Sequence, residues 1–301
     1  MNHTLKWLVA LACFSVAVAF GDPPTGKYKR IVDDLAQVQN SFPAYASVFS
    51  IGQNDDGTEI YALRVSATPQ RMDGAKIGHL MVGTHHGNES HAPLFVVRFI
   101  NHLVKRFSTD ALWKDGLADH EWTFIPVLNI SGYNSSSRYE KGVDPNRDYP
   151  GPCNPNPGGK LQSIRTLMSF LSQRQFSGAV TVHGYIGTMT YPWGVDTDTV
   201  ETLDHNLFAQ ITAKAAEFNG YRHGTHTDIV YPATGTFEDF SYWKYGMWAL
   251  LLELKSGSNQ DLDDSVLAIE SYYSQLAATP STHFDFLGKC LRARSIDLQL
   301  D

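Results

Sequence analysis

The chain has 301 residues, of which 43% are apolar and 18% are charged, and its formal net charge is −7. This balance is typical of a globular protein with a sizeable core. The acidic net charge argues against nonspecific nucleic-acid binding, which needs clustered Lys and Arg. No internal repeat, low-complexity tract or long linker interrupts the chain. We therefore expect one domain, from residue 25 to residue 301.

The first 20 residues have the pattern of a secretory signal peptide. Lys6 gives one positive charge, residues 7–20 are almost wholly apolar, and Ala17-Val18-Ala19 offers a small-residue cleavage site. The apolar run is shorter than the ~20 residues that a membrane-spanning helix needs. We expect residues 1–19 to be removed and the protein to be secreted or periplasmic, with no membrane span afterwards. A retained anchor is the alternative.

Two cysteines remain after such a cleavage, Cys153 and Cys290. An exported chain with two cysteines can form one disulfide, but two free thiols are a nearly equal alternative. The sequence does not decide between them.

Apolar periodicity predicts helices and strands along the rest of the chain. In chain order we expect a helix at 27–39, strands at 44–51 and 59–65, a strand at 77–82, a helix at 92–107, a strand at 122–128, a helix at 161–171, a strand at 178–182, a helix at 199–218, a strand at 247–254, and helices at 262–276 and 284–294. The turn sequence Asn54-Asp55-Asp56-Gly57 joins the first two strands into a hairpin. Alternating strands and helices after a hairpin predict an α/β fold with one mixed sheet and helices on both faces.

Chemically reactive side chains follow several of the predicted strands. His86 and Glu89 come three residues apart just after the strand at 77–82, and His183 follows the strand at 178–182. Functional sites of such sheets lie at the carboxyl ends of their strands. Two histidines and one carboxylate that leave a fourth position open are typical of catalytic zinc. Each residue alone is more often a surface or core residue, so the prediction depends on all three together.

Glu253 interrupts the most apolar run of the chain, Leu250-Leu251-Leu252-Glu253-Leu254. A carboxylate in such a run is costly unless it is paired or used. It is therefore a candidate general base. A structural ion pair, with Lys255 or with an arginine, is the alternative.

The segment Asp144-Pro145-Asn146-Arg147, with Arg138 upstream, is a candidate for binding an anionic group. Arginine binds carboxylates through two parallel hydrogen bonds, and asparagine adds a donor. For Arg147 alone, a surface role is the more frequent case.

In this order the segments resemble the zinc carboxypeptidase family of the pancreatic A and B type. The likeness extends over more than half of the mature chain. The matching segments are His86-x-x-Glu89, Asp144-x-Asn146-Arg147, His183-x-Tyr185 followed by Tyr191-Pro192-Trp193-Gly194, residues 231–242, and Leu252-Glu253-Leu254. The resemblance implies a metallocarboxypeptidase that acts on peptides with a free C-terminal carboxylate and binds one Zn²⁺ ion. We expect a monomer.

The resemblance also implies a role for each residue. His86, Glu89 and His183 are expected to bind zinc, and Asp144 is expected to orient His86. Glu253 is expected to act as base and then as proton donor.

On the substrate side, Asn146 and Arg147 are expected to hold the terminal carboxylate. Arg138 is expected to stabilise the oxyanion, and Tyr231 to cap the terminal residue. Glu238 falls where the family places the base of its specificity pocket, which suggests a preference for C-terminal Lys, Arg or diaminopimelate.

The sequence departs from the pancreatic pattern near the substrate. It has Asn129-Ile130-Ser131-Gly132 after the middle strand, and Asn88 stands where those enzymes carry an arginine. Gly87-Asn88-Glu89 is closer to murein-peptide amidases and to aspartoacylase-like deacylases. Hydrolysis of a murein peptide or of an N-acyl amino acid is therefore the alternative function, and a non-catalytic binding module is a more distant one.

Overall fold

The computed structural model describes residues 24–71, 74–111, 113, 119–154, 156–276 and 286–291. The predicted signal peptide, residues 1–19, lies outside these residues. In the part of the chain that is described, no helix combines the length and the hydropathy needed to cross a membrane.

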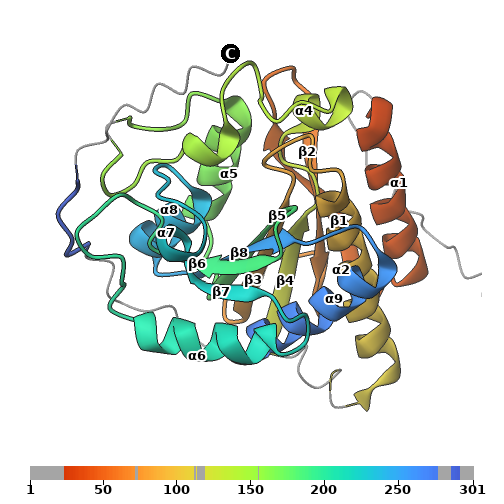
Figure 1. The fold of residues 1–301 in the computed structure, drawn as a ribbon. Helices are drawn as coiled ribbons and strands as arrows, with labels where there is room; N and C mark the ends of the chain where they lie inside the picture. The colour runs from red at the N-terminus through yellow and green to blue at the C-terminus, as the bar shows by residue number, and fades with distance from the viewer. Residues whose placement is uncertain are drawn as a thin grey trace, which may run out of the picture.

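One eight-stranded mixed sheet organises the chain (Figure 1). Its strands, in the spatial order β1-β2-β4-β3-β5-β8-β6-β7, are β1 (Ala46–Gln53), β2 (Glu59–Val65), β4 (His120–Ile125), β3 (Ile77–Gly83), β5 (Gly178–Gly184), β8 (Trp248–Leu254), β6 (Thr188–Tyr191) and β7 (Arg222–Thr225). The four central strands β4, β3, β5 and β8 run parallel to one another. Their carboxyl ends therefore meet at one edge of the sheet.

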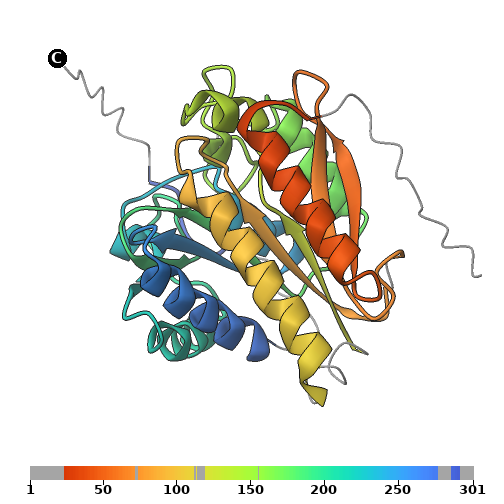
Figure 2. The same cartoon turned by 90° about the vertical axis from the view of Figure 1, so that its right-hand side faces the viewer.

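Helices cover both faces of this sheet, as the sequence predicts. The helices α1 (Gly26–Ser41), α2 (His91–Thr109) and α9 (Asn259–Ser274) lie on one face, with α6 (His205–Ala216) packed beside α9 (Figure 2). The helices α5 (Gln162–Ser172) and α8 (Phe237–Tyr245) pack against the strands from the other side. Because both faces are covered, the central strands β3 and β8 are almost continuously apolar and buried.

The hairpin between β1 and β2 forms for the reason that its turn sequence indicates. The side chain of Asn54 accepts hydrogen bonds from the backbone N–H groups of Asp56 and Thr58, and Gly57 adopts a positive φ of 83°. Glycine adopts that conformation without steric cost.

Two predicted helices in the C-terminal half differ from the structure, and three elements there have no counterpart in the prediction. The predicted helix at 284–294 is wrong where it can be compared, because residues 286–291 are not helical and Cys290 forms a β-bridge with Thr197. The predicted helix at 199–218 begins only at His205. The strands β6 and β7 and the helix α8 were not predicted at all.

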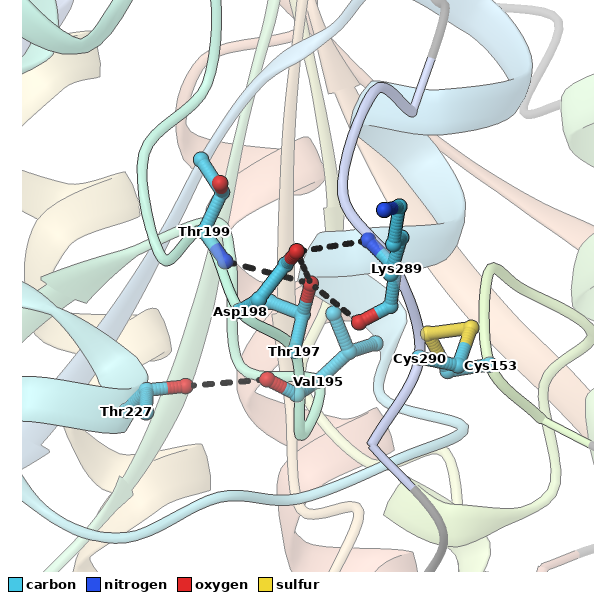
Figure 3. The surroundings of a disulfide bond; sticks show 8 residues. All are labelled: Cys153, Val195, Thr197, Asp198, Thr199, Thr227, Lys289 and Cys290. Atoms are coloured by element: carbon cyan, nitrogen blue, oxygen red, sulfur yellow. Dashed lines mark hydrogen bonds between the residues drawn. A yellow bond between two sulfur atoms is a disulfide. The ribbon is translucent and has the colours of Figure 1, made fainter.

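A disulfide joins Cys153 to Cys290, with their Cα atoms 5.2 Å apart, which decides the open question of the two cysteines (Figure 3). Hydrogen bonds surround it, since Lys289 N donates to Asp198 Oδ1 over 2.6 Å and Thr197 Oγ1 donates to Lys289 O over 3.2 Å. The segment 286–291 is thereby fixed across the loop that follows β6.

Candidate metal centre and active site

The carboxyl ends of three adjacent parallel strands bring the candidate residues together. His86 and Glu89 follow β3, His183 lies near the end of β5, and Glu253 lies near the end of β8. The register of the β5–β8 pair sets His183 directly beside Glu253. In the order of the sheet, the strand that follows β3 in the chain (β4) lies to one side, whereas the strand that follows β5 (β6) lies to the other, so the direction in which strands are added changes between β3 and β5. Open α/β sheets bind their ligands at such a point.

The turn after β3 places His86 and Glu89 on the same side. Thr84 adopts a left-handed φ of 59° and turns the chain away from the strand. At Gly87 a Cβ atom would lie 2.0 Å from the carbonyl carbon of Gly132, in the short helix α4 (Ile130–Ser135). Only glycine permits this approach of the two backbones. The close contact therefore explains the Gly87 that separates the two candidate ligands.

His86, Glu89 and His183 present three ligand atoms that converge within the protein. Nδ1 of His86 lies 2.7 Å from Glu89 Oε1, Nδ1 of His183 lies 3.0 Å from Glu89 Oε2, and the two Nδ1 atoms are 3.2 Å apart. All three residues are buried. Zinc–ligand distances of about 2.0–2.2 Å in a tetrahedron imply ligand atoms roughly 3.3 Å apart. The donor set and its spacing therefore fit a zinc ion.

Asp144 links the candidate ligand His86 to Arg138. Its Oδ1 lies 3.0 Å from His86 Nε2, and its Oδ2 accepts hydrogen bonds from Arg138 Nε at 3.1 Å and Nη2 at 2.9 Å. Although burial acts in the opposite direction, His86 and Arg138 hold the pKa of the Asp144 carboxyl below its usual range. An ionised Asp144 keeps the proton of His86 on Nε2, which leaves Nδ1 free for a metal ion.

Glu253 provides a carboxylate beside this cluster. Burial raises the pKa of its carboxyl above the ordinary value, while His183 acts in the opposite direction. Its Oε2 is buried and has no hydrogen-bond partner among the described residues. Among the described residues, no salt bridge joins Glu253 to Lys255, the pair that the sequence left open.

Arg147 and Tyr231 contact each other. Arg147 Nη2 donates to Tyr231 Oη over 3.1 Å, and the guanidinium carbon lies 5.8 Å from the centre of the Tyr231 ring. Tyr231 is 50% exposed. Asn146 lies in the 3-10 turn η1 (Pro145–Arg147), where its side-chain oxygen accepts from Phe237 N over 2.8 Å. The tyrosine therefore covers the arginine that the sequence assigns to an anionic group.

Glu238 lies deeper in the protein, at the start of α8, and is 4% exposed. Its Oε1 accepts a hydrogen bond from the Thr181 hydroxyl. Thr181 precedes His183 by two residues on β5, and side chains two apart lie on the same face of a strand. The carboxylate of Glu238 thus lies on the same face of the sheet as His183. It is further than His183 from the edge at which the carboxyl ends of the parallel strands meet.

Three further residues near the site have no role assigned from the sequence. His85 and Tyr149 form a hydrogen bond of 2.8 Å between His85 Nε2 and Tyr149 Oη. Asp239 accepts hydrogen bonds from Gly194 N at 2.9 and 3.1 Å, and burial raises the pKa of its carboxyl to about 7. The sequence gives only one signal for any of them, which is the Thr236-x-x-Asp239 spacing at the start of α8.

Comparison with known proteins agrees with a zinc hydrolase of this architecture. A sequence model of the family described as zinc carboxypeptidase matches residues 31–267. The chain therefore belongs to the zinc carboxypeptidase family, whose members bind the metal that the His86, Glu89 and His183 cluster fits.

Individual relatives are more distant. Carboxypeptidase SOL1 of Arabidopsis thaliana is 24% identical over 245 residues, which cover 74% of this chain and 49% of that protein. Human carboxypeptidase B is 25% identical over 264 residues, which cover 76% of this chain and 62% of the relative. The chain thus spans about half to three fifths of the length of these two relatives.

Solved structures share the fold at lower identity. Thrombin-activatable fibrinolysis inhibitor superposes with a TM-score of 0.71 at 16% identity, covering 82% of this chain and 73% of the other. Carboxypeptidase A from Helicoverpa armigera also gives a TM-score of 0.71 at 16% identity, with 83% and 73% covered. These likenesses extend to the arrangement of the sheet and its helices.

Proposed function

We propose that this protein is a zinc-dependent carboxypeptidase that hydrolyses the C-terminal peptide bond of peptides. The proposal rests mainly on the convergence of His86, Glu89 and His183 beside Glu253. The Arg147–Tyr231 pair supports it, because its guanidinium offers a place for a terminal carboxylate.

In this proposal His86, Glu89 and His183 hold the metal, and a zinc ion bound there supplies Lewis acidity and lowers the pKa of water. Glu253 accepts a proton from the attacking water and delivers it to the departing amine. Burial, which raises the pKa of this carboxyl, favours its acceptance of the proton. Asp144 holds the proton of His86 on Nε2 and so keeps that imidazole in the ligand form.

In the same proposal, a second set of residues binds the substrate. Arg147 and Asn146 bind the terminal carboxylate, and Tyr231 folds over the terminal residue once its hydroxyl leaves Arg147. Arg138 stabilises the negative oxygen that develops at the scissile carbonyl. Because its guanidinium now donates to Asp144, it must share or exchange that partner during the reaction.

A preference for basic C-terminal residues is the finer part of the proposal. The buried carboxylate of Glu238 lies beneath His183 with the Thr181 hydroxyl as its hydrogen-bond donor. A buried carboxylate favours a cationic partner because an unpaired charge is costly there. The amine of Lys or of diaminopimelate, or the guanidinium of Arg, would supply this partner.

The remaining parts of the proposal concern the whole protein. Residues 1–19 direct export and are removed, and residues 25–301 form one catalytic domain that acts as a secreted or periplasmic monomer. The cross-link between Cys153 and Cys290 supports export, since disulfides persist in oxidising compartments.

The test is a substrate panel read by mass spectrometry. Zinc-loaded protein is incubated with peptides that end in Lys, Arg, Phe, Glu or diaminopimelate, and with N-acetyl amino acids. Glu253→Gln is the control for contaminating activity. Loss of a single C-terminal residue that is absent in the control is the expected result.

Other outcomes point elsewhere. Cleavage of only the murein peptide or only the N-acyl compounds would assign the alternative function. For the basic preference, Glu238→Gln is compared with wild type on peptides ending in Lys and Phe. A Lys-to-Phe rate ratio that stays the same in this variant would remove Glu238 from the proposal.

A further inference from the structure

The two candidate imidazole ligands differ in what contacts their second ring nitrogen. His86 has Asp144 3.0 Å from its second ring nitrogen. The second nitrogen of His183, Nε2, is buried and has no hydrogen-bond partner among the described residues. A histidine that binds a metal ordinarily donates its other N–H to a carboxylate, a carbonyl or water, which fixes the plane of the ring. The ring of His183 therefore needs another means of orientation.

The ring of His85 provides a surface for the His183 imidazole. The two rings are stacked, with centroids 5.5 Å apart and planes inclined by only 19°. On another side, His183 meets the ring of His86 in an edge contact of 4.8 Å at 63°. His85 and His183 are both buried to within 1% of complete burial. Packing against His85 thus limits the rotation of the His183 ring where a hydrogen bond does not.

Tyr149 fixes the ring of His85 in turn. Its hydroxyl lies 2.8 Å from His85 Nε2. The Tyr149 ring stacks on Phe240 at 5.4 Å and meets Phe237 edge-on at 5.6 Å, so it is anchored to α8. Its backbone N–H donates to Gly235 O over 3.1 Å. A continuous set of contacts therefore leads from α8 through Tyr149 and His85 to His183.

We infer that His85 and Tyr149 are positioning residues for the metal centre, which hold the His183 imidazole in the plane from which Nδ1 reaches the ion. This inference rests on the proposed role of His183 as a ligand. His85 and Tyr149 do not bind the metal themselves, and they act only through the His183 ring. Neighbouring groups that orient metal ligands commonly contribute about 10–100-fold to metal affinity.

Two variants break the same hydrogen bond from opposite ends. Tyr149→Phe removes the hydroxyl, and His85→Phe keeps an aromatic ring but removes the nitrogen. We expect each to raise the dissociation constant of zinc, measured by competition with a chelator, by about 10-fold. The visible absorption of the Co²⁺-substituted protein should change in intensity or position, because it reports the geometry of the ligands.

Tyr272→Phe is the matched control. Tyr272 is as completely buried as Tyr149, and its hydroxyl donates a hydrogen bond to Trp248 O over 3.2 Å, on the other face of the sheet. This control should lose a similar amount of stability but keep the zinc affinity and the Co²⁺ spectrum of the wild type. Wild-type affinity and spectrum in both Tyr149→Phe and His85→Phe would overturn the inference.

The double variant adds an independent criterion. If both residues act through one hydrogen bond, combining Tyr149→Phe with His85→Phe should weaken zinc binding no more than either change alone. If the effects of the two single changes on zinc affinity multiply instead, the idea that both residues act through one hydrogen bond is contradicted.

The variant His183→Ala tests the proposed ligand role of His183 separately from the positioning role of His85 and Tyr149. Zinc affinity unchanged in His183→Ala would reject the ligand set, whereas a large loss there with no effect of Tyr149→Phe would reject the positioning role alone.

Discussion

Replacing Asp144 with asparagine keeps the shape of the side chain but removes its charge. In the wild type one carboxylate contacts His86 Nε2 at 3.0 Å and Arg138 at 2.9 and 3.1 Å. A hydrogen bond to a charged group contributes about 1.5–3 kcal/mol. If that energy holds His86 in its ligand form, Asp144→Asn should weaken zinc binding by about 10–100-fold, at about 1.4 kcal/mol per factor of ten.

The assay is the dissociation constant of zinc, measured by competition with a chelator at fixed pH. The chain offers a matched control in Glu270→Gln, because Glu270 also bridges a histidine and an arginine, His102 and Arg106. The two carboxylates are similarly exposed, 15% for Glu270 and 17% for Asp144. Only the Asp144 variant should lose zinc affinity. Equal affinities in the two variants would refute the role of the Asp144 charge.

Three further predictions concern Glu253, Glu140 and the disulfide. Glu253→Gln should lower kcat by about 10²–10⁴-fold while zinc affinity is retained, and a kcat within a factor of ten of wild type would exclude Glu253 as the base. Burial raises the pKa of Glu140 to about 7 despite the Ser163 hydroxyl, so the folded state binds this proton more tightly than the unfolded state. The contribution of this proton to the free energy of unfolding is complete below pH 4.5 and is lost as the pH rises toward 7. The change in that free energy is about 3 kcal/mol, at 1.36 kcal/mol per pH unit. Urea unfolding should show this decline in wild type and less of it in Glu140→Gln, and equal slopes would contradict it. Cys153→Ala should lower the free energy of unfolding by about 2–5 kcal/mol, and an unchanged urea midpoint would show that the cross-link adds no stability.

Much of the central sheet and most of the candidate site could be predicted from the sequence. Buried parallel strands such as β3 and β8 are apolar along most of their length, so they stand out from the rest of the chain. His86, His183 and Glu253 are conspicuous because each is polar at the end of such a run. The carboxyl ends of parallel strands share an edge, and this rule alone predicts that the three meet.

The elements that were missed lack the patterns on which prediction depends. β6 has four residues, too few for a periodicity, and β7 reads Arg-His-Gly-Thr with little apolar content. The helix α8 is rich in aromatic residues, which are only moderate helix formers, and buried side chains lie all around its first half. Its Thr236 cap and the left-handed Gly246 at its end were the available signals.

Long-range partners could not be predicted because nothing in the spacing relates them. His85 and Tyr149 are 64 positions apart, and neither resembles a ligand or a base in its local sequence. The predicted helix at 284–294 failed for a related reason. Its described residues form a bridge to Thr197 and a disulfide to Cys153, and both tertiary contacts outweigh a local preference for helix.

The disulfide also closes a covalent ring in the chain, since Cys153 and Cys290 are 137 positions apart. His183, Tyr231 and Glu253 lie on the ring, whereas His86, Glu89 and Arg147 lie on the open chain before it. A single proteolytic cut between residues 154 and 289 therefore cannot separate the two groups, and the two fragments would stay covalently joined until a reductant is added. On gels, such a cut would be invisible without reductant and would appear as two fragments with it.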